Sequence, residues 1–378
     1  KVEKNVTFVD KMGDLSFHME KIYVEEDFSR LYRLLAEERA YFVVMDANAS
    51  PHFSFPSDRV LEISASEDKK TLAAVEGILR FLLEREAGRD AFLLGIGGGV
   101  TTDLAGLAAA IYKRGIRYAL VPTTLLAQAD AAIGGKTGAN VCGYKNVAGT
   151  FSEPEFVYSV PGVLSTLPAR EMLSGAGEIL KTFIIGSATL FDEAVGLFSH
   201  CRTYGLMDAG ERETLKRLIS GAMELKVSIT QKDRLEASER RKLNLGHTFG
   251  HALETFCLTG GSPSCGNGCG IGRRAGEAVS GGITHGAAVA AGIMIAARVS
   301  ERLGCLAAAE SERLVGGLVA AGFTPPDKNI VPQLVKAVRN DKKRKEDFIN
   351  FVLIRRIGSV FVEKIPVGVL ESLADDLY

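Results

Sequence analysis

The chain has 378 residues, of which 24% are charged, and its formal net charge at pH 7 is −1. This length is sufficient for two domains with well-filled cores, and the balanced charge argues against a nucleic-acid or membrane-surface partner. The most apolar run, residues 287–299, is too short to span a bilayer and predicts a buried helix. The charged N-terminus lacks the apolar stretch of a signal peptide, and the six cysteines are scattered, so we expect a cytoplasmic enzyme with reduced thiols.

The first 165 residues alternate short apolar, β-branched runs with segments of helical periodicity. Residues 41–46, 60–64 and 91–95 are predicted to be strands, and residues 27–38 and 70–86 carry apolar side chains at helical spacing. This alternation predicts an α/β domain with a Rossmann-like, mostly parallel sheet and helices on both faces.

From about Leu167 onward the pattern is helical almost throughout. Helices are predicted at residues 190–198, 211–232, 246–256, 287–303 and 307–321, and a small hairpin at 348–354 and 360–362. We therefore expect an α/β domain over 1–165 and an all-α domain over 166–378. Residues 258–283 are glycine-rich without periodicity and predict a long loop, in which Cys265 and Cys269 are interpreted as free thiols.

A glycine-rich stretch, GIGGGVTTD at 95–103, follows a predicted strand and opens a predicted helix. Glycines let the backbone approach a pyrophosphate closely, and a helix N-terminus supplies N–H donors. Nucleotide binding is therefore favoured over a turn without a ligand. Asp46 ends an earlier strand and is a candidate for a ribose hydroxyl; the alternative is an ordinary turn residue.

A second glycine-rich stretch, GGKT at 134–137, imitates the end of a P-loop. The full pattern needs glycine at position 130, where this chain has Asp130, so an NTPase is rejected. Lys136 still lies in a polar region that suits a phosphate or a polyol, unless its members are solvated surface charges. That region also contains Arg114, Lys145 and Asn146.

Two histidines, His247 and His251, stand four residues apart, which places both on one face of a helix. Thr248 follows His247, so the H-E-x-x-H zinc pattern is not met. Glu178 lies in an apolar helical segment and needs a partner, either Lys181 or a cation. Together with His285, at the start of the apolar helix, these residues suit a three-ligand zinc site with an open position, although spacing alone does not bring them together.

Lys226, Arg240 and Asn244 precede or flank the histidines on predicted helices. One substrate anion could recruit all three, whereas each taken alone is more often a surface cation or a helix cap.

Eight stretches together carry a resemblance to a known family over nearly the whole chain. They are GGGVTTDLAG at 97–106, YKRGI at 112–116, VPTTLLAQADAAIGGKTGAN at 121–140, KN at 145–146, SGAGEILK at 174–181, RRKLNLGHTFGHALE at 240–254, ITHGAAVAAGI at 283–293 and DKK at 341–343. In these segments the chain resembles the 3-dehydroquinate synthases.

The resemblance implies an NAD-binding α/β domain, a helical domain, and a catalytic cleft between them. It implies a zinc ion, with cobalt as a possible substitute, bound by Glu178, His247 and His285. His251 matches a hydrogen-bonding catalytic group, and the other positions with implied catalytic roles are Lys136, Asp130, Glu178 and Lys181. The substrate-binding positions it implies are Arg114, Asp130, Lys136, Asn146, Lys181, Lys226, Arg240, Asn244, His251 and one of Lys342 and Lys343. The NAD-binding positions are Asp46, Glu67, Lys70, Gly98, Gly99, Val100, Asp103, Thr123, Thr124 and Lys145.

The implied reaction converts a heptulosonate phosphate, 3-deoxy-D-arabino-heptulosonate 7-phosphate, to 3-dehydroquinate and phosphate with NAD regenerated. The implied assembly is a homodimer in which Arg114 reaches the substrate phosphate across the interface. Three alternatives stay open: a related sugar-phosphate cyclase, a metal-dependent polyol dehydrogenase, and a nucleotide-binding protein without activity. In two places the chain departs from the family pattern, namely Ala287 in place of glutamate and the long segment 258–283.

Overall fold

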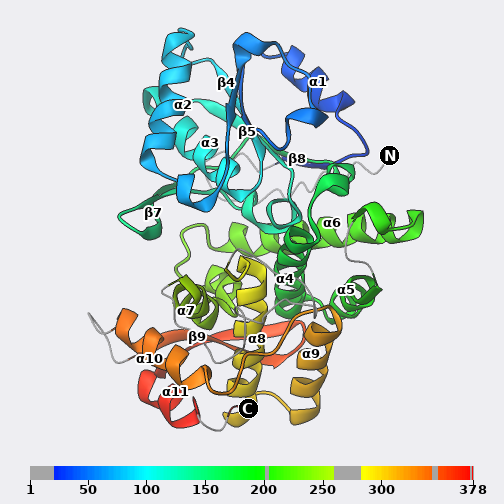
Figure 1. Ribbon diagram of the computed structural model, residues 1–378, viewed down its shortest axis with the longest axis vertical. Coiled ribbons are helices and arrows are strands. Elements are labelled where there is room, and N and C mark those ends of the chain that lie inside the picture. The colour runs from blue at the N-terminus through cyan, green and yellow to red at the C-terminus, as the bar shows by residue number, and fades with distance from the viewer. Residues whose placement is uncertain (1–20, 201–203, 259–281, 343–347, 375–376, 378) are drawn as a thin grey trace, which may run out of the picture.

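The computed structural model describes residues 21–200, 204–258, 282–342, 348–374 and 377. Its N-terminal part contains a six-stranded parallel sheet in the order β1-β8-β5-β4-β2-β3 (Figure 1). The strands are β1 (Lys21–Val24), β2 (Tyr41–Asp46), β3 (Val60–Ile63), β4 (Phe92–Gly97), β5 (Arg117–Pro122) and β8 (Phe156–Ser159). The predicted parallel sheet is confirmed, and β2, β3 and β4 are the strands expected from the sequence.

Helices cover both faces of this sheet. On one face α1 (Ser29–Ala36) buries Leu31 and Leu35 in a cluster that contains Val43. On the other face α2 (Leu72–Glu84) and α3 (Gly99–Ile111) pack in the cluster that contains Val44. Neighbouring side chains of a strand point to opposite faces, so Val43 and Val44 of β2 belong to different cores.

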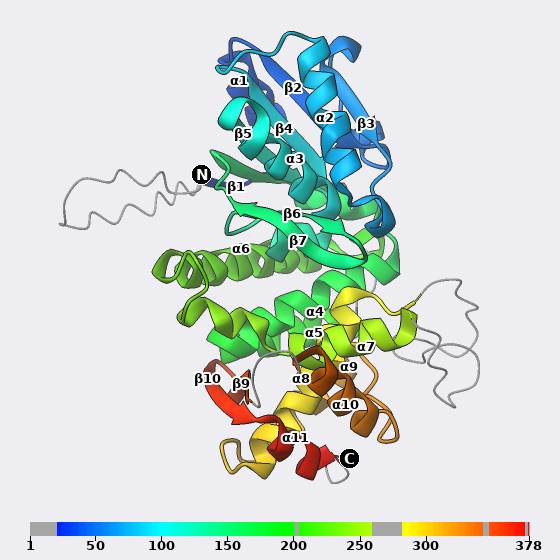
Figure 2. The same ribbon diagram turned by 90° about the vertical axis from the view of Figure 1, so that its left-hand side faces the viewer.

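An antiparallel hairpin, β6 (Lys136–Val141) and β7 (Tyr144–Phe151), was not expected from the sequence. Figure 2 places it between the sheet and the long helix α6 (Ala209–Lys232). Gly134 and Gly135, with φ of 88° and 64°, turn the chain into β6. The GGKT stretch therefore leads into a strand, and does not join a strand to a helix as a P-loop does.

The C-terminal part is helical, with one hairpin near its end. Its remaining helices are α4 (Ala169–Gly186), α5 (Ala188–His200), α7 (His247–Leu258), α8 (His285–Arg302), α9 (Ala308–Ala320), α10 (Val331–Lys342) and α11 (Val367–Leu373). The hairpin consists of β9 (Phe348–Arg356) and β10 (Ser359–Pro366), close to its predicted position. Within the described residues, no helix combines the length and the apolar character required for a membrane span.

Helices α4, α7 and α8 approach one another at glycines. A Cβ atom added to Gly286 would lie 1.8 Å from the carbonyl oxygen of Ser174, and one added to Gly177 would lie 2.5 Å from that of Gly286. A Cβ atom on Gly292 would lie 2.0 Å from the carbonyl oxygen of Gly246. The three helix backbones are therefore in direct contact, at distances that no larger residue allows.

Candidate active site

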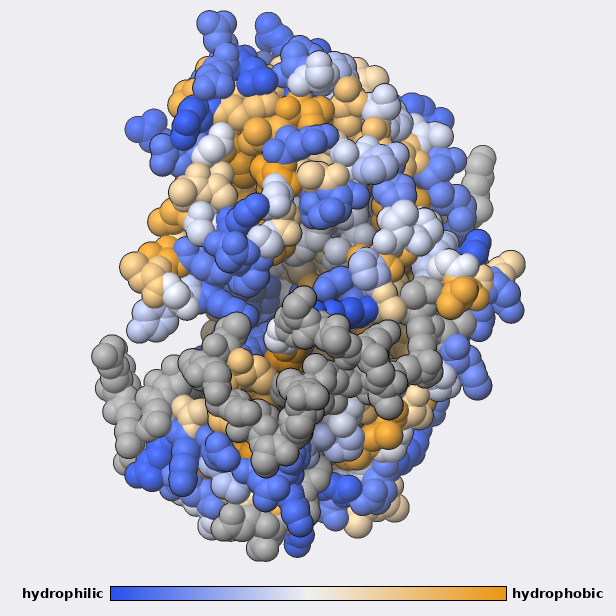
Figure 3. All heavy atoms as spheres, viewed as in Figure 1, coloured by the Kyte–Doolittle hydropathy of each residue, from blue (hydrophilic) through white to orange (hydrophobic). Residues whose placement is uncertain are grey.

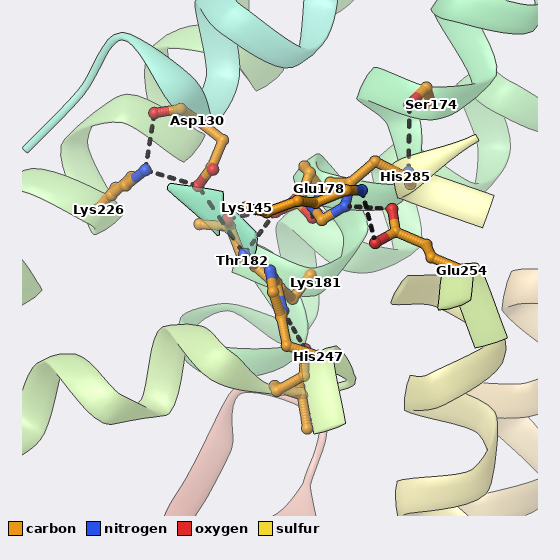
Figure 4. Close-up of polar contacts among 12 residues, drawn as sticks. Asp130, Lys145, Ser174, Glu178, Lys181, Thr182, Lys226, His247, Glu254 and His285 are labelled. Atoms are coloured by element: carbon orange, nitrogen blue, oxygen red, sulfur yellow. Dashed lines mark hydrogen bonds and ion pairs between the residues drawn. The ribbon is translucent and has the colours of Figure 1, made fainter. Parts of the chain in front are cut away.

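One carboxylate and two histidines from these three helices form a cluster. Glu178 lies in α4, and His247 and His285 are the first residues of α7 and α8. Each offers one ligand atom, and these atoms lie within 4.8 Å of one another. Nε2 of His285 is 3.4 Å from Oε1 of Glu178. Figure 4 shows these two labelled side chains close together. The fold thus brings together side chains that are far apart in the sequence.

His247 presents a neutral ring to this cluster. Burial, reinforced by the nearby Lys181 ammonium, lowers the pKa of His247 to about 3. Its Nδ1 is 3.2 Å from the carbonyl oxygen of Leu245, which only accepts hydrogen bonds. Nδ1 therefore carries the proton, and Nε2 keeps its lone pair for a metal ion.

His285 lies between two carboxylates. Burial alone would lower its pKa, but hydrogen bonds to Glu178 and Glu254 outweigh burial and raise the pKa to about 10. For Glu178 the effects are reversed. Burial raises the pKa of this carboxyl group, but Lys181 and the two histidines outweigh burial and hold the pKa well below its usual range. The cluster thus favours positive charge beside Glu178.

This donor set fits a divalent metal ion. One carboxylate oxygen and two imidazole nitrogens are typical ligands of catalytic zinc, and three protein ligands leave a position open for a substrate oxygen. Both carboxylate oxygens of Glu178 are buried, and the groups that face them are the cationic side chains of Lys181 and His285. Metal binding would replace the proton that His285 holds towards Glu178.

Next to the cluster, two buried lysines flank Asp130. Nζ of Lys226 is 2.8 Å from Oδ1 of Asp130 and donates to its backbone oxygen at 2.7 Å. Nζ of Lys181 is 3.8 Å from the same Oδ1 and also pairs with Glu178. Burial raises the pKa of Asp130, but the two ammonium groups lower it below its usual value. Lys181 therefore connects the histidine cluster to Asp130.

A third group surrounds Glu236, which the sequence analysis did not single out. Its carboxylate pairs with Lys136 and accepts a hydrogen bond of 2.6 Å from Nδ2 of Asn244. Arg240, only 2% exposed, donates to the carbonyl oxygens of Gly134 at 2.7 Å and Arg234 at 2.8 Å. Nothing in the local sequence marks Glu236, because its ion-pair partner Lys136 comes from a hairpin that is remote in sequence.

The glycine-rich turn lies between β4 and α3, as the sequence predicts. A Cβ atom on Gly98 would lie 3.0 Å from Cγ2 of Thr124, and the amide of Thr123 donates to Gly97 O at 2.9 Å. These residues form one surface at the carboxyl ends of β4 and β5, where open parallel sheets bind ligands. Val100 lies in the first turn of α3.

Further predicted cofactor residues lie at the end of β2, in the segment before α2 and in α3. Nζ of Lys70 pairs with Asp103 and donates to Oδ1 of Asn146 at 2.6 Å. Glu67 accepts a hydrogen bond of 2.8 Å from Nδ2 of Asn140. The carboxylate of Asp46 accepts from the backbone and side chain of Asn48, so it closes the turn after β2.

The remaining predicted residues are placed less centrally. His251 is exposed on α7, with its ring centroid 5.2 Å from that of His247. Arg114 is exposed on the turn after α3, and within the described ranges no hydrogen bond or ion pair joins it to the cluster. Lys342 ends α10, but its side chain, Lys343 and residues 259–281 lie outside the described residues. Lys145 pairs with Glu254, a second carboxylate that the sequence analysis did not single out.

Comparisons with known proteins decide between the families that such a site allows. A model of the N-terminal part of 3-dehydroquinate synthase matches residues 60–174, and a model of its C-terminal part matches residues 175–344. The chain belongs to the 3-dehydroquinate synthase family. The 3-dehydroquinate synthase of Halorhodospira halophila is 36% identical over 97% of this chain and 98% of its own length. That of Cereibacter sphaeroides is 35% identical over 84% of this chain and 80% of its own.

Solved structures with the same fold include two sugar-phosphate cyclases. A 2-epi-5-epi-valiolone synthase from Streptomyces hygroscopicus, with NAD+ and Zn2+ bound, is 25% identical and superimposes with a TM-score of 0.77 over 98% of this chain and 99% of that one. A 2-deoxy-scyllo-inosose synthase is 22% identical, with a TM-score of 0.71 over 94% and 96% of the two chains. The predicted fold, an α/β part followed by a helical part typical of 3-dehydroquinate synthases, is therefore confirmed.

Proposed function

We infer that this chain is a 3-dehydroquinate synthase, a carbon–oxygen lyase of the shikimate pathway for aromatic amino acids. Its substrate is 3-deoxy-D-arabino-heptulosonate 7-phosphate, and its products are 3-dehydroquinate and phosphate. The observation that carries this inference is the convergence of Glu178, His247 and His285 beside buried lysines, in a chain that matches the family over residues 60–344.

We propose NAD and one divalent metal ion, zinc or cobalt, as the cofactors. The donor set of the cluster supports the metal, and the valiolone synthase of similar fold contains NAD+ and Zn2+. When bound, NAD supplies a reversible hydride acceptor and the metal supplies Lewis acidity. The residues proposed to bind NAD are Asp46, Glu67, Lys70, Gly98, Gly99, Val100, Asp103, Thr123, Thr124 and Lys145.

The chain's own side chains divide into three tasks. Glu178, His247 and His285 bind the metal ion, and His251 moves a proton at the edge of the cluster. Cationic and amide groups bind the substrate's carboxylate, phosphate and hydroxyls, and Asp130 orients two of the lysines. The groups proposed for binding are Arg114, Asp130, Lys136, Asn146, Lys181, Lys226, Arg240, Asn244, His251 and Lys342 or Lys343.

The ion pairs described above explain how such a cationic site exists without substrate. Lys181, Lys226 and Lys136 pair with Glu178, Asp130 and Glu236, so none of the three ammonium groups is desolvated without a counter-charge. An anionic substrate can then compete with these carboxylates for the same ammonium groups, which favours acidic sugar phosphates over neutral sugars.

We further propose a cytoplasmic homodimer built from an NAD-binding domain, 1–165, and a metal- and substrate-binding domain, 166–378. The cytoplasmic location follows from the biosynthetic reaction and its use of NAD. The hairpin supports the dimer, because Tyr144 is 68% exposed and Val147 is 64% exposed. In Figure 3 hydrophobic side chains gather on the protrusion where Figure 1 places β7.

An assay of phosphate release tests the function. The purified chain, loaded with zinc and less NAD than substrate, should release one phosphate per heptulosonate phosphate without accumulating NADH. Net NADH formation would instead identify a polyol dehydrogenase. Equal turnover of a sugar phosphate without a carboxylate would identify a related sugar-phosphate cyclase.

A further inference from the structure

Glu254 is a buried carboxylate that none of the proposed roles includes. It lies on α7, seven residues after His247 and three after His251, so the three side chains share one face of that helix. Its exposed fraction is only 7%. A carboxylate is costly to bury unless each of its oxygens has a polar partner, so its contacts indicate why it is there.

The two oxygens of Glu254 have two different partners. Oε1 is 3.1 Å from Nδ1 of His285, and Oε2 is 3.2 Å from Nζ of Lys145 (Figure 4). His285 comes from α8, whereas Lys145 comes from the β6–β7 hairpin of the N-terminal part. One carboxylate therefore contacts both a proposed metal ligand and the strand that carries a proposed NAD-binding lysine.

The contact at His285 decides which ring nitrogen carries the proton. Because an ionised carboxylate only accepts, the hydrogen of the neutral ring lies on Nδ1 and points at Glu254. Nε2 then has its lone pair directed to the side where Glu178 lies, at 3.4 Å. The hydrogen bond also limits rotation of a ring that is otherwise 36% exposed at the side chain.

We propose that Glu254 is a positioning residue: through Oε1 it fixes the tautomer and the orientation of His285 for metal binding. Through Oε2 it keeps Lys145, and with it the hairpin, beside the metal centre. This inference rests on the metal site of the proposed function, although it does not depend on which sugar phosphate is the substrate.

Zinc affinity of the whole chain tests the proposal, measured by competition with a chromogenic chelator. Glu254→Ala should weaken zinc binding about 10–100-fold, the usual effect of losing a carboxylate that orients a histidine ligand. Glu254→Gln keeps the shape and one acceptor oxygen, so it should restore part of that loss. In the cobalt-loaded chain, Glu254→Ala should also shift the visible absorption bands, because the ring of His285 is no longer fixed.

Two matched variants separate this explanation from general electrostatics. Lys145→Met leaves the contact between Oε1 and His285 in place, and Glu301→Gln removes a carboxylate near the far end of α8 that pairs with Arg298. Glu301→Gln should bind zinc as the unmodified chain does, and Lys145→Met should weaken zinc binding less than Glu254→Ala does.

Three results would overturn the positioning role. They are unchanged zinc affinity in Glu254→Ala, a complete loss of zinc equal to that of Glu178→Gln, or an equal weakening in Lys145→Met. The complete loss would make Glu254 a ligand in a second cluster with His251 and His285, whose ligand atoms also lie within 4.8 Å. If zinc binding depends on Glu254 as expected but no phosphate is released from the heptulosonate phosphate, the proposed function fails and this inference stands.

Discussion

His247 and His285 are each the first residue of a helix, yet their surroundings shift their pKa values in opposite directions. His247 faces a backbone carbonyl and the Lys181 ammonium, so it stays neutral, whereas His285 faces two carboxylates and holds a proton. A divalent cation satisfies both, because it uses the lone pair of the first and replaces the proton of the second.

The first prediction concerns the three proposed ligands. Glu178→Gln, His247→Ala and His285→Ala should each lose zinc and most activity, because a three-ligand site has no spare donor. Metal analysis of the purified variants measures this. His200→Ala, an exposed histidine at the end of α5, is the control and should keep its metal. Full zinc occupancy in any of the three variants would remove that residue from the ligand set.

The second prediction concerns His251, which shares the cluster's helix face but is exposed. His251→Ala should keep zinc, while kcat falls by about 10²–10⁴, the range for a positioned acid–base group. Zinc content and steady-state kinetics of one preparation check both parts. Loss of zinc would instead place His251 among the ligands.

The third prediction concerns substrate choice at Arg240. A planar guanidinium can present paired donors to a carboxylate, which a lysine cannot copy. Glucose 6-phosphate and sedoheptulose 7-phosphate should be poorer substrates than the heptulosonate phosphate by about 10⁴–10⁵ in kcat/KM. Arg240→Leu should remove most of that preference, mainly by slowing the preferred reaction, and Arg240→Lys should restore only part of it.

Lys242→Leu is the control for Arg240, because Lys242 lies on the same short helical segment and pairs with Glu239. It should leave the preference unchanged. A comparable kcat/KM of the unmodified chain for a sugar phosphate without a carboxylate would contradict the dehydroquinate synthase assignment.

At the scale of elements, the position of the cluster depends on glycine contacts between helices. Gly292 of α8 faces the carbonyl oxygen of Gly246, one residue before His247, at 2.0 Å from where its Cβ atom would be. Gly316 of α9 is also helical, but its Cβ atom would meet nothing within 4 Å. Both glycines therefore lie within helices, but only at Gly292 would an added Cβ atom collide with a neighbouring backbone.

The fourth prediction compares alanine at these two glycines. Gly292→Ala should destabilise the chain by about 1–3 kcal/mol, the usual cost of overpacking, and weaken zinc binding by moving α7 away from α8. Gly316→Ala should be neutral or stabilise by about 0.5–1 kcal/mol, since alanine favours helix. Thermal unfolding and zinc titration of both variants measure this. If the two variants changed equally in stability and in zinc affinity, helix propensity and not the close contact would explain the effect of Gly292→Ala.

The same elements show what the sequence can and cannot predict. The turn at 95–103 and the helix with two histidines follow local periodicity and glycine placement, so they could be predicted. The hairpin β6–β7 could not, because its strands mix polar, glycine and apolar residues without a regular alternation of apolar and polar side chains along the sequence. The meeting of α4, α7 and α8 depends on tertiary packing, so the spacing of residues leaves the ligand set open and only the resemblance to a known family names it.

The position of Glu254 in the sequence already indicates its role. It continues the spacing of His247 and His251 along one helix face, at positions i, i+4 and i+7. A carboxylate on the same face as two candidate ligands is a candidate for orienting one of them. Glu236 offers no comparable signal, since Lys136 is remote in sequence.

At the scale of the whole molecule, ion pairs join the N-terminal hairpin region to the C-terminal helices. Besides the contacts of Lys226 and Lys136, Nζ of Lys145 is 3.2 Å from Glu254, and Nε of Arg234 is 3.2 Å from Glu153. These pairs surround the proposed site, so charged contacts link the hairpin region to the helices that carry the proposed metal ligands.

The fifth prediction follows from the carboxylates in these pairs. Burial raises the pKa of Glu254, but His285 and Lys145 outweigh it and lower the pKa to about 2, and Lys136 and Asn244 similarly lower that of Glu236. A depressed pKa stabilises the folded chain above the ordinary value near 4.5, and this stabilisation is lost as pH falls towards 2. For Glu254 the loss is on the order of 2–3 kcal/mol.

Melting temperatures of the metal-free chain between about pH 6 and pH 3 measure this decline. Glu254→Gln should start from a lower melting temperature near pH 6 and fall less steeply. A pH profile parallel to that of the unmodified chain would show that Glu254 does not contribute.

The contacts of α4, α7 and α8 also bear on how sequences of this kind can change. Each proposed ligand has a neighbour in the chain that admits only hydrogen at its α-carbon: Gly177 before Glu178, Gly246 before His247, and Gly286 after His285. A gene copy that kept the three ligands but acquired alanine beside any of them would retain the motif and lose the geometry. When uncharacterised sequences are sorted into metal-binding and metal-free groups, these glycines should therefore count as much as the ligands themselves.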